Sequence, residues 1–94
     1  MDNRVSRYSM KMGQCEITGE FLQANEVHCH HYIPIQLGGS DTFNNLRILH
    51  KDIHAVIHLT DRNAIKLRLK NFKINQDIIN KINKYRKKCG MESI

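Results

Sequence analysis

The stretch His28-Cys-His-His31, followed by Asn45-Leu46 and by His54-x-x-x-His58, decides how this chain of 94 residues folds. Residues four apart on a helix share one face, so His54 and His58 are placed to bind one ion together. The earlier group alternates its side chains at a period of two, as a short strand does. A hairpin followed by a helix would bring both groups around one metal. All six histidines gather in the middle of the chain, between positions 28 and 58, at positions 28, 30, 31, 50, 54 and 58.

Two short strands and a helix are predicted around these histidines. The first strand covers residues 26–31 and is limited by Pro34, and the second covers Leu46–Leu49. The turn residues Gly38-Gly39-Ser40-Asp41 lie between them, so the strands are expected to pair across a long, irregular connection. A helix over residues 51–59 should follow directly.

Helices are also predicted on both sides of this centre. Val5, Tyr8 and Met12 are spaced as on the buried face of a short amphipathic helix that ends at Gly13. Beyond the centre, two helices are expected over residues about 61–71 and 76–89. Thr60 and Asn75 suit their N-caps and Gly90 suits the final stop. Their buried faces would come from Ile65, Leu69, Phe72, Ile78, Ile79, Ile82 and Tyr85.

The length of the chain suits one compact domain with a modest core, so we treat residues 1–94 as a single unit of the α+β class. We divide it into an N-terminal helix (1–14), a core of two strands and a helix (15–59), and a basic helical tail (60–94). The sequence has neither a long apolar run nor a secretory signal, which favours an intracellular protein without a membrane span.

The charge distribution favours a polyanionic partner. The formal net charge is +6 and the pI is about 9.5, which favour nucleic acid or an acidic membrane surface. Ten of the fifteen Lys and Arg residues lie between Arg62 and Lys88. A solvated helix surface would explain any one of them, whereas their collective bias suggests a flank that grips phosphates. The candidates for that role are Arg62, Lys66, Arg68, Lys84, Arg86 and Lys87.

The combination His30-His31-x-x-Pro34, Gly38-Gly39, Asn45-Leu46 and His54 resembles the pattern of HNH endonucleases, whose fold is the ββα-metal motif, also called the His-Me finger. More narrowly, the runs that begin at Cys15, His28 and Asn45 and the basic tail are similar to the C-terminal nuclease domain of bacterial group II intron-encoded reverse transcriptase/maturases. This resemblance extends from about Arg7 onward.

The resemblance implies a role for each residue of the motif. His31 would be the general base that takes a proton from the attacking water, a task that suits a side chain with a pKa near working pH. His30, His54 and His58 would bind the metal, with His58 either a third ligand or a phosphate contact. Asn45 would hold the loop through backbone hydrogen bonds and so aim His31. His28 points to the same side of the strand as His30, as an outer-shell or phosphate-binding residue.

One divalent metal ion is implied by the same resemblance. Mg²⁺ or Mn²⁺ is expected in function, and imidazole ligands also suit Zn²⁺ or Ni²⁺. A structural zinc ion is not expected, because two CxxC pairs of a common relative are here reduced to Cys15-x-x-Thr18 and His50-x-x-Ile53. Packing of Ile17, Phe21 and Ile53 should replace it. The three cysteines are too far apart in sequence for a disulfide framework.

Three functions compete at this stage. The first is a DNA endonuclease with double-stranded DNA as its substrate, acting in the bacterial cytoplasm, with intron RNA or a separate reverse transcriptase as further partners. The second is a non-catalytic nucleic-acid-binding module stabilised by a metal. The third, a colicin-type toxin, would need a delivery domain and an immunity partner. The presence of both His31 and Asn45 favours the first.

Overall fold

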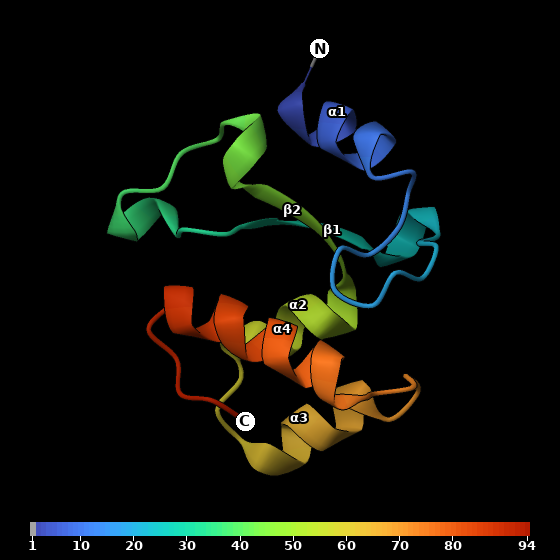
Figure 1. Ribbon diagram of the computed structural model, residues 1–94, viewed down its shortest axis with the longest axis vertical. Coiled ribbons are helices and arrows are strands. Elements are labelled where there is room, and N and C mark those ends of the chain that lie inside the picture. The colour runs from blue at the N-terminus through green and yellow to red at the C-terminus, as the bar shows by residue number, and fades with distance from the viewer. Residues whose placement is uncertain (1) are drawn as a thin grey trace.

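The computed structural model describes residues 2–94, which form a small α+β fold (Figure 1). Within these residues there are two strands, four α-helices and three short 3-10 helices. The α-helices are α1 (Asn3–Met10), α2 (Lys51–His58), α3 (Arg62–Leu69) and α4 (Gln76–Lys88). The strands are β1 (Val27–His31) and β2 (Leu46–His50). The predicted fold class and the order of strand, strand and helix are confirmed.

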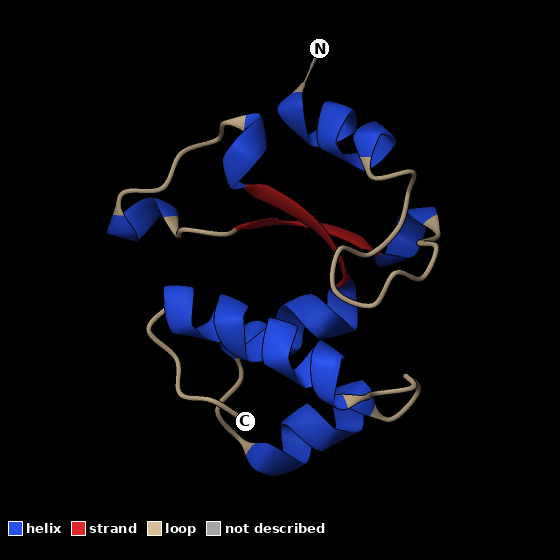
Figure 2. Cartoon of the chain, in the orientation of Figure 1, coloured by secondary structure: helices blue, strands red, loops and turns tan. Residues whose placement is uncertain are grey.

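The two strands pair antiparallel and form the only sheet within residues 2–94 (Figure 2). His30 lies opposite Arg47, and His28 lies opposite Leu49. The second strand continues into α2 at Lys51, and the ring of His50 caps this helix by accepting a hydrogen bond from the backbone N–H of Asp52. Since no loop separates the strand from the helix, the direction of the helix is fixed relative to the hairpin.

The sheet lies between α1 on one side and the helices α2 and α4 on the other (Figure 1). The apolar face of α2 is fully buried against β2 and α4, and it contributes Ile53, Val56 and Ile57 to the core. Ile82 and Tyr85 of α4 belong to the same core. The helix α3 packs on α2 at the far end of the molecule from α1.

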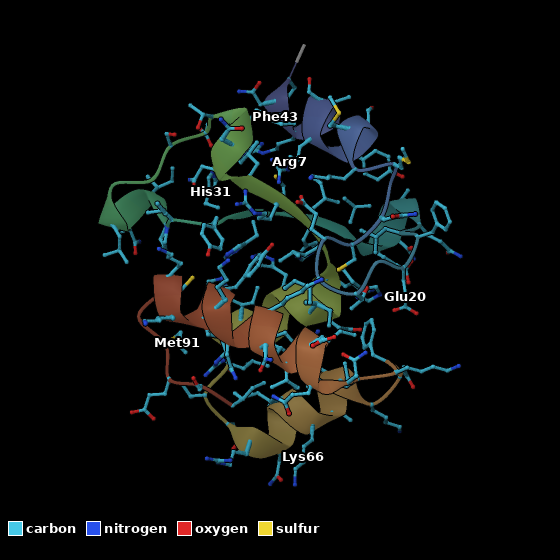
Figure 3. All side chains as sticks on the ribbon, in the orientation of Figure 1. Arg7, Glu20, His31, Phe43, Lys66 and Met91 are labelled. Atoms are coloured by element: carbon cyan, nitrogen blue, oxygen red, sulfur yellow. The ribbon has the colours of Figure 1, made fainter. Side chains whose placement is uncertain are left out.

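The N-terminal helix has a different buried face from the one predicted. Val5, Tyr8 and Met12 are exposed, and the helix ends at Met10 rather than at Gly13. Arg7 is the buried residue of α1: its guanidinium donates to Glu16 at 2.6 and 3.0 Å and to the backbone oxygen of Phe43 at 3.1 Å. The prediction failed because a buried ion pair between Arg7 and Glu16, and not an apolar stripe, joins this helix to the core. Figure 3 shows Arg7 near Phe43.

Two smaller predictions also needed correction. The N-cap of α3 is Asp61 and not Thr60, whereas Asn75 does cap α4. Phe21 is exposed and so does not replace a zinc site, although Ile17 and Ile53 are in the core. Among residues 2–94, no helix combines the length and the apolar character that a bilayer crossing requires.

Candidate metal centre

Three histidines from β1 and α2 converge on one point beneath the hairpin. One ring nitrogen from each of His30, His54 and His58 lies within 4.8 Å of the other two. The ring centroids are 5.1 to 5.4 Å apart. Neutral imidazoles are good ligands for divalent first-row transition metals, so the donor set fits one such ion. The predicted hairpin and helix therefore do bring these three side chains together.

His30 is the most deeply placed member of the cluster. It is only 3% exposed, and its Nε2 is buried with no hydrogen-bond partner among the described residues. A buried polar atom without a partner costs folding free energy unless something binds it. Burial, aided by the neighbouring imidazoles, lowers the pKa of His30 to about 3. The ring is therefore neutral at physiological pH and offers a lone pair, as a metal ligand must.

His54 and His58 share the face of α2 that is directed toward His30. Burial, with His58 and His28 nearby, lowers the pKa of His54 to about 4. The pKa of His58 is also lowered, first by burial and then by the positive charge of Arg86. The ring of His54 is thus neutral at the pH at which an ordinary histidine begins to protonate, and protonation of His58 is disfavoured as well. The site is ready to bind a cation without first releasing protons.

His28 adds a fourth imidazole at the rim of the cluster. Its Nδ1 lies 2.9 Å from Nδ1 of His54, so one ring donates a hydrogen bond to the other. When His54 is the donor from Nδ1, its Nε2 carries the lone pair and is available as a ligand atom. Ligand histidines commonly form such a second hydrogen bond, which fixes the orientation of the ring. The position agrees with the outer-shell role considered from the sequence, and that role stays a prediction.

His31 lies at the end of β1, next to the cluster in sequence but not among its three rings. Its Nε2 is 2.6 Å from a carboxylate oxygen of Asp41, which is itself largely exposed. The hydrogen bond to His31 is the main reason that the pKa of Asp41 is lowered. An ionised carboxylate only accepts hydrogen bonds, so His31 donates from Nε2, and in the neutral form of the ring Nδ1 then carries the lone pair. Sequence reasoning missed Asp41 and read it only as part of a turn.

Asn45 holds the loop that connects the two strands. Its side-chain oxygen accepts a hydrogen bond from the backbone N–H of Ile33 at 2.8 Å, and its Nδ2 donates to the backbone oxygens of Ile33 and Ser40 at 3.0 and 2.8 Å. Gly39 allows the two ends of the loop to approach each other closely, because a Cβ at this position would lie 1.8 Å from the backbone oxygen of Ile33. These are the loop-anchoring bonds expected of Asn45, while its part in catalysis stays a prediction.

The helix α4 supports the cluster from below. The ring of Tyr85 stacks on that of His30, with centroids 5.9 Å apart and planes at 26°. Arg86, which is 3% exposed, donates from Nη1 to the backbone oxygens of Val56 and Leu59 at 2.7 Å. These bonds satisfy carbonyl groups at the end of α2, where an unpaired negative dipole would otherwise remain.

The position of Arg86 corrects one of the predicted phosphate contacts. Its guanidinium is buried and used by the main chain, so it does not face a nucleic acid. The physical reason is that the carbonyl groups at the end of α2 need donors inside the fold. The other basic candidates, Arg62, Lys66, Arg68, Lys84 and Lys87, are exposed, and Arg68 pairs with Asp52 at 2.8 Å. Lys66 lies at the opposite end of the molecule from His31 (Figure 3).

Two other cations approach the ring of Tyr32, the residue that follows His31, and were missed. The guanidinium of Arg47 lies 4.6 Å from the ring centre of Tyr32, and Nζ of Lys88 lies 5.8 Å from the same ring. Arg47 is also the partner of His30 in the register of the two strands. The register of the two strands was the signal that would have identified Arg47.

Cys15 and His50, which were compared with the CxxC pairs of a relative, have other functions in this fold. Cys15 is buried in the core, and both ring nitrogens of His50 have partners: Nδ1 accepts from Asp52, and Nε2 lies 3.1 Å from Glu26. The hydrogen bond to His50 helps to lower the pKa of Glu26, after the larger effect of the Gln23 backbone. The absence of a structural zinc ion stays a prediction.

Comparison with known proteins identifies one family. Residues 13–58 match the model of a family described as HNH endonuclease. This segment contains the whole hairpin and α2, and it ends at His58, whereas α1, α3 and α4 lie outside it. No curated protein and no solved structure matches the chain significantly.

Proposed function

From the HNH match over residues 13–58, we propose that this chain is a metal-dependent endonuclease that hydrolyses phosphodiester bonds in DNA. The observation that carries the proposal is the convergence of His30, His54 and His58, together with the unpartnered Nε2 of the buried His30. A deep polar atom without a partner is typical of a functional site, because a purely structural core would replace it with an apolar group.

We propose that these three histidines hold one divalent ion, Mg²⁺ or Mn²⁺ in function, with Zn²⁺ or Ni²⁺ as alternatives. When bound, such an ion stabilises negative charge on the phosphate and on the departing 3′ oxygen. The protein contributes neutral rings held at fixed positions. β1 fixes His30, the turns of α2 fix His54 and His58, and His28 orients His54 through the 2.9 Å contact.

His31 would act as the general base. With its Nε2–H donated to Asp41, its Nδ1 is free to take a proton from a water molecule. As the water oxygen forms its bond to phosphorus, the bond from phosphorus to the 3′ oxygen breaks, and the leaving oxygen takes a proton from solvent. Asn45 contributes indirectly, because its hydrogen bonds to Ile33 fix the backbone two residues beyond His31.

Duplex DNA would be the substrate, and phosphate contacts would fix the protein on it without reading its sequence. The net charge of +6 supports this choice. The exposed basic residues on α3 and α4 would supply phosphate contacts. To these we add Arg47 and Lys88, which both approach the ring of Tyr32. A bacterial cytoplasmic location, and an intron RNA or a separate reverse transcriptase as partner, are further proposals that rest on sequence resemblance alone.

A plasmid assay tests the proposed function. Incubation of supercoiled plasmid with the protein and Mg²⁺, Mn²⁺ or Ni²⁺ should yield nicked or linear DNA, and His31→Ala should abolish this while metal binding persists. The matched control is His50→Asn, which removes a histidine outside the cluster and keeps an oxygen acceptor that can cap α2. A protein that only binds DNA would shift its mobility, and wild type and His31→Ala would then behave alike with every metal.

A further inference from the structure

The loop that follows His31 exposes a group of aliphatic side chains. Ile33 is 40% exposed, Ile35 is 51% exposed and Leu37 is 62% exposed. They lie within five consecutive residues, and the loop projects at the edge of the molecule (Figure 1). A clustered apolar surface of this kind on a charged protein marks a contact site more often than an isolated exposed leucine does.

This apolar loop, residues 33–37, is held firmly in place. Pro34 begins a 3-10 helix over Ile35–Leu37, and Gly38 ends it in the left-handed region. The backbone oxygen of Pro34 accepts from the N–H groups of Leu37 and Gly39, both at 2.9 Å. The side chain of Asn45 binds both polar backbone groups of Ile33. These hydrogen bonds fix the backbone that carries the exposed aliphatic side chains. The loop would therefore lose little conformational entropy on binding a partner.

The base of the loop is positively charged. Tyr32, directly before it, has the guanidinium of Arg47 at 4.6 Å and the ammonium of Lys88 at 5.8 Å from its ring centre. The one nearby acid that we identify, Asp41, is engaged by His31. An apolar tip above a cationic base matches a DNA groove, in which base edges lie between two rows of phosphates.

We propose that this apolar loop inserts into a groove of duplex DNA and packs against the bases beside the cleaved phosphate. The inference rests on the proposed function, because the apolar loop begins two residues after His31, the proposed base at the cleaved phosphate. Aliphatic side chains are used in this way by proteins that wedge into DNA and unstack its base pairs. A second copy of the chain is a poorer partner, since a standard interface covers about 800 Å² per protein and this loop offers three partly exposed side chains.

A tryptophan reporter tests the insertion directly, because the chain contains no tryptophan. Leu37→Trp places one at the loop tip, and Met10→Trp is the matched control, since Met10 is 67% exposed on α1, a helix without any of the proposed phosphate contacts. The full chain is titrated with a short duplex in EDTA, so that no cleavage occurs. Stacking on bases should strongly quench the emission of Leu37→Trp and leave that of Met10→Trp nearly unchanged. Equal quenching of the two would overturn the inference.

Affinity measurements give an independent readout. Leu37→Ser should weaken duplex binding about tenfold, as expected from the loss of one buried aliphatic contact, whereas Met10→Ser on α1 should bind as wild type. The dependence of affinity on salt should keep its slope in Leu37→Ser, because no phosphate contact is lost. Lys88→Ala should reduce that slope. A Leu37→Ser variant with wild-type affinity would contradict the inference.

Other partners are separate outcomes of the same reporter. A blue shift of Leu37→Trp on vesicles of phosphatidylglycerol, or with rising protein concentration, without quenching by DNA would overturn the inference in favour of a membrane or a second copy. Failure of the proposed function is distinguishable. If no metal supports plasmid cleavage but DNA still quenches Leu37→Trp, the loop inference stands and the nuclease proposal fails. If the plasmid is cut without this quenching, the reverse holds.

Discussion

Arg86 on α4 donates a hydrogen bond of 2.7 Å to the backbone oxygen of Val56 on α2, thirty residues earlier in the chain. The helix that receives this bond carries His54 and His58. A residue outside the segment that matches the HNH family thus holds the helix that supplies two of the three clustered histidines. The metal site depends on α4 as well as on the hairpin and α2.

Removal of this guanidinium should loosen the metal site. Arg86→Met should cost about 3 kcal/mol of stability, because several buried carbonyl groups lose their donor. It should also weaken the binding of Co²⁺, which would be followed by its absorption spectrum at a temperature where the variant is fully folded. Arg7→Met is the control: it too breaks buried hydrogen bonds, but on α1, and should destabilise the protein with little effect on Co²⁺ affinity. Equal losses of metal affinity in both variants would contradict a specific role for Arg86.

The buried Nε2 of His30 should lower the stability of the metal-free protein, although the same nitrogen is needed to bind metal. His30→Leu fills a similar volume and removes a polar atom without a partner, so the metal-free protein should be about 1 kcal/mol more stable in urea unfolding. Metal should no longer raise its melting temperature, whereas the wild type should gain about 2.7 kcal/mol at a metal concentration of about one hundred times Kd. A variant that is still stabilised by metal would show that His30 is not a ligand.

The carboxylate of Asp41 should act on the reaction through His31. Asp41→Ala should lower kcat about tenfold, since the base loses the partner that fixes its tautomer and orientation. Affinity for DNA in EDTA should stay the same or rise slightly, because a negative charge is removed. Asp77→Ala, on the exposed first turn of α4, makes the same change in charge and should leave kcat unchanged. Faster cleavage by Asp41→Ala would instead mean that this carboxylate blocks the site.

The metal-free protein should lose stability in acid. The pKa of His30 is lowered to about 3 and that of His54 to about 4, from an unfolded value of 6.5. The unfolded chain therefore binds protons below pH 6.5 that the folded chain does not, and stability falls as the pH drops from 6.5 toward 3. His30 alone should contribute a slope of up to about 1.4 kcal/mol per pH unit. Urea unfolding in EDTA at several pH values checks this, and His30→Leu should show a shallower dependence.

The two neighbouring glycines of the loop should differ in their tolerance of alanine. A Cβ on Gly39 would lie 1.8 Å from the backbone oxygen of Ile33 and 2.9 Å from Nδ2 of Asn45, so the loop has to open. Gly39→Ala should therefore cost more than about 2 kcal/mol and sharply reduce plasmid nicking. Gly38→Ala meets no atom within 4 Å and has only its φ of 94° to accommodate, at a cost of about 1 kcal/mol. If Gly39→Ala and Gly38→Ala lost similar amounts of thermal stability and of nicking activity, the close approach of Gly39 to Ile33 would be unimportant.

The sequence by itself determined the central ββα arrangement and the meeting of His30, His54 and His58. Local rules suffice for these features. Strand alternation separates His30 from His31, a spacing of four places His54 above His58, and a strand that runs into a helix leaves little freedom between them. The matches are close: α2 ends at His58 and α4 begins directly after Asn75.

Only the tertiary structure decided which polar groups are buried and which partners they find. From sequence, Arg86 was read as part of a phosphate-gripping flank, because long charged side chains are usually exposed. Asp41 was read as part of a turn, and the predicted apolar face of the first helix did not include Arg7. In the fold, Arg7 and Arg86 are buried and donate hydrogen bonds to carboxylate and carbonyl oxygens of other segments. Asp41 contacts a histidine ten residues away. Such contacts depend on how far-separated helices and strands pack, which no periodicity along the chain records.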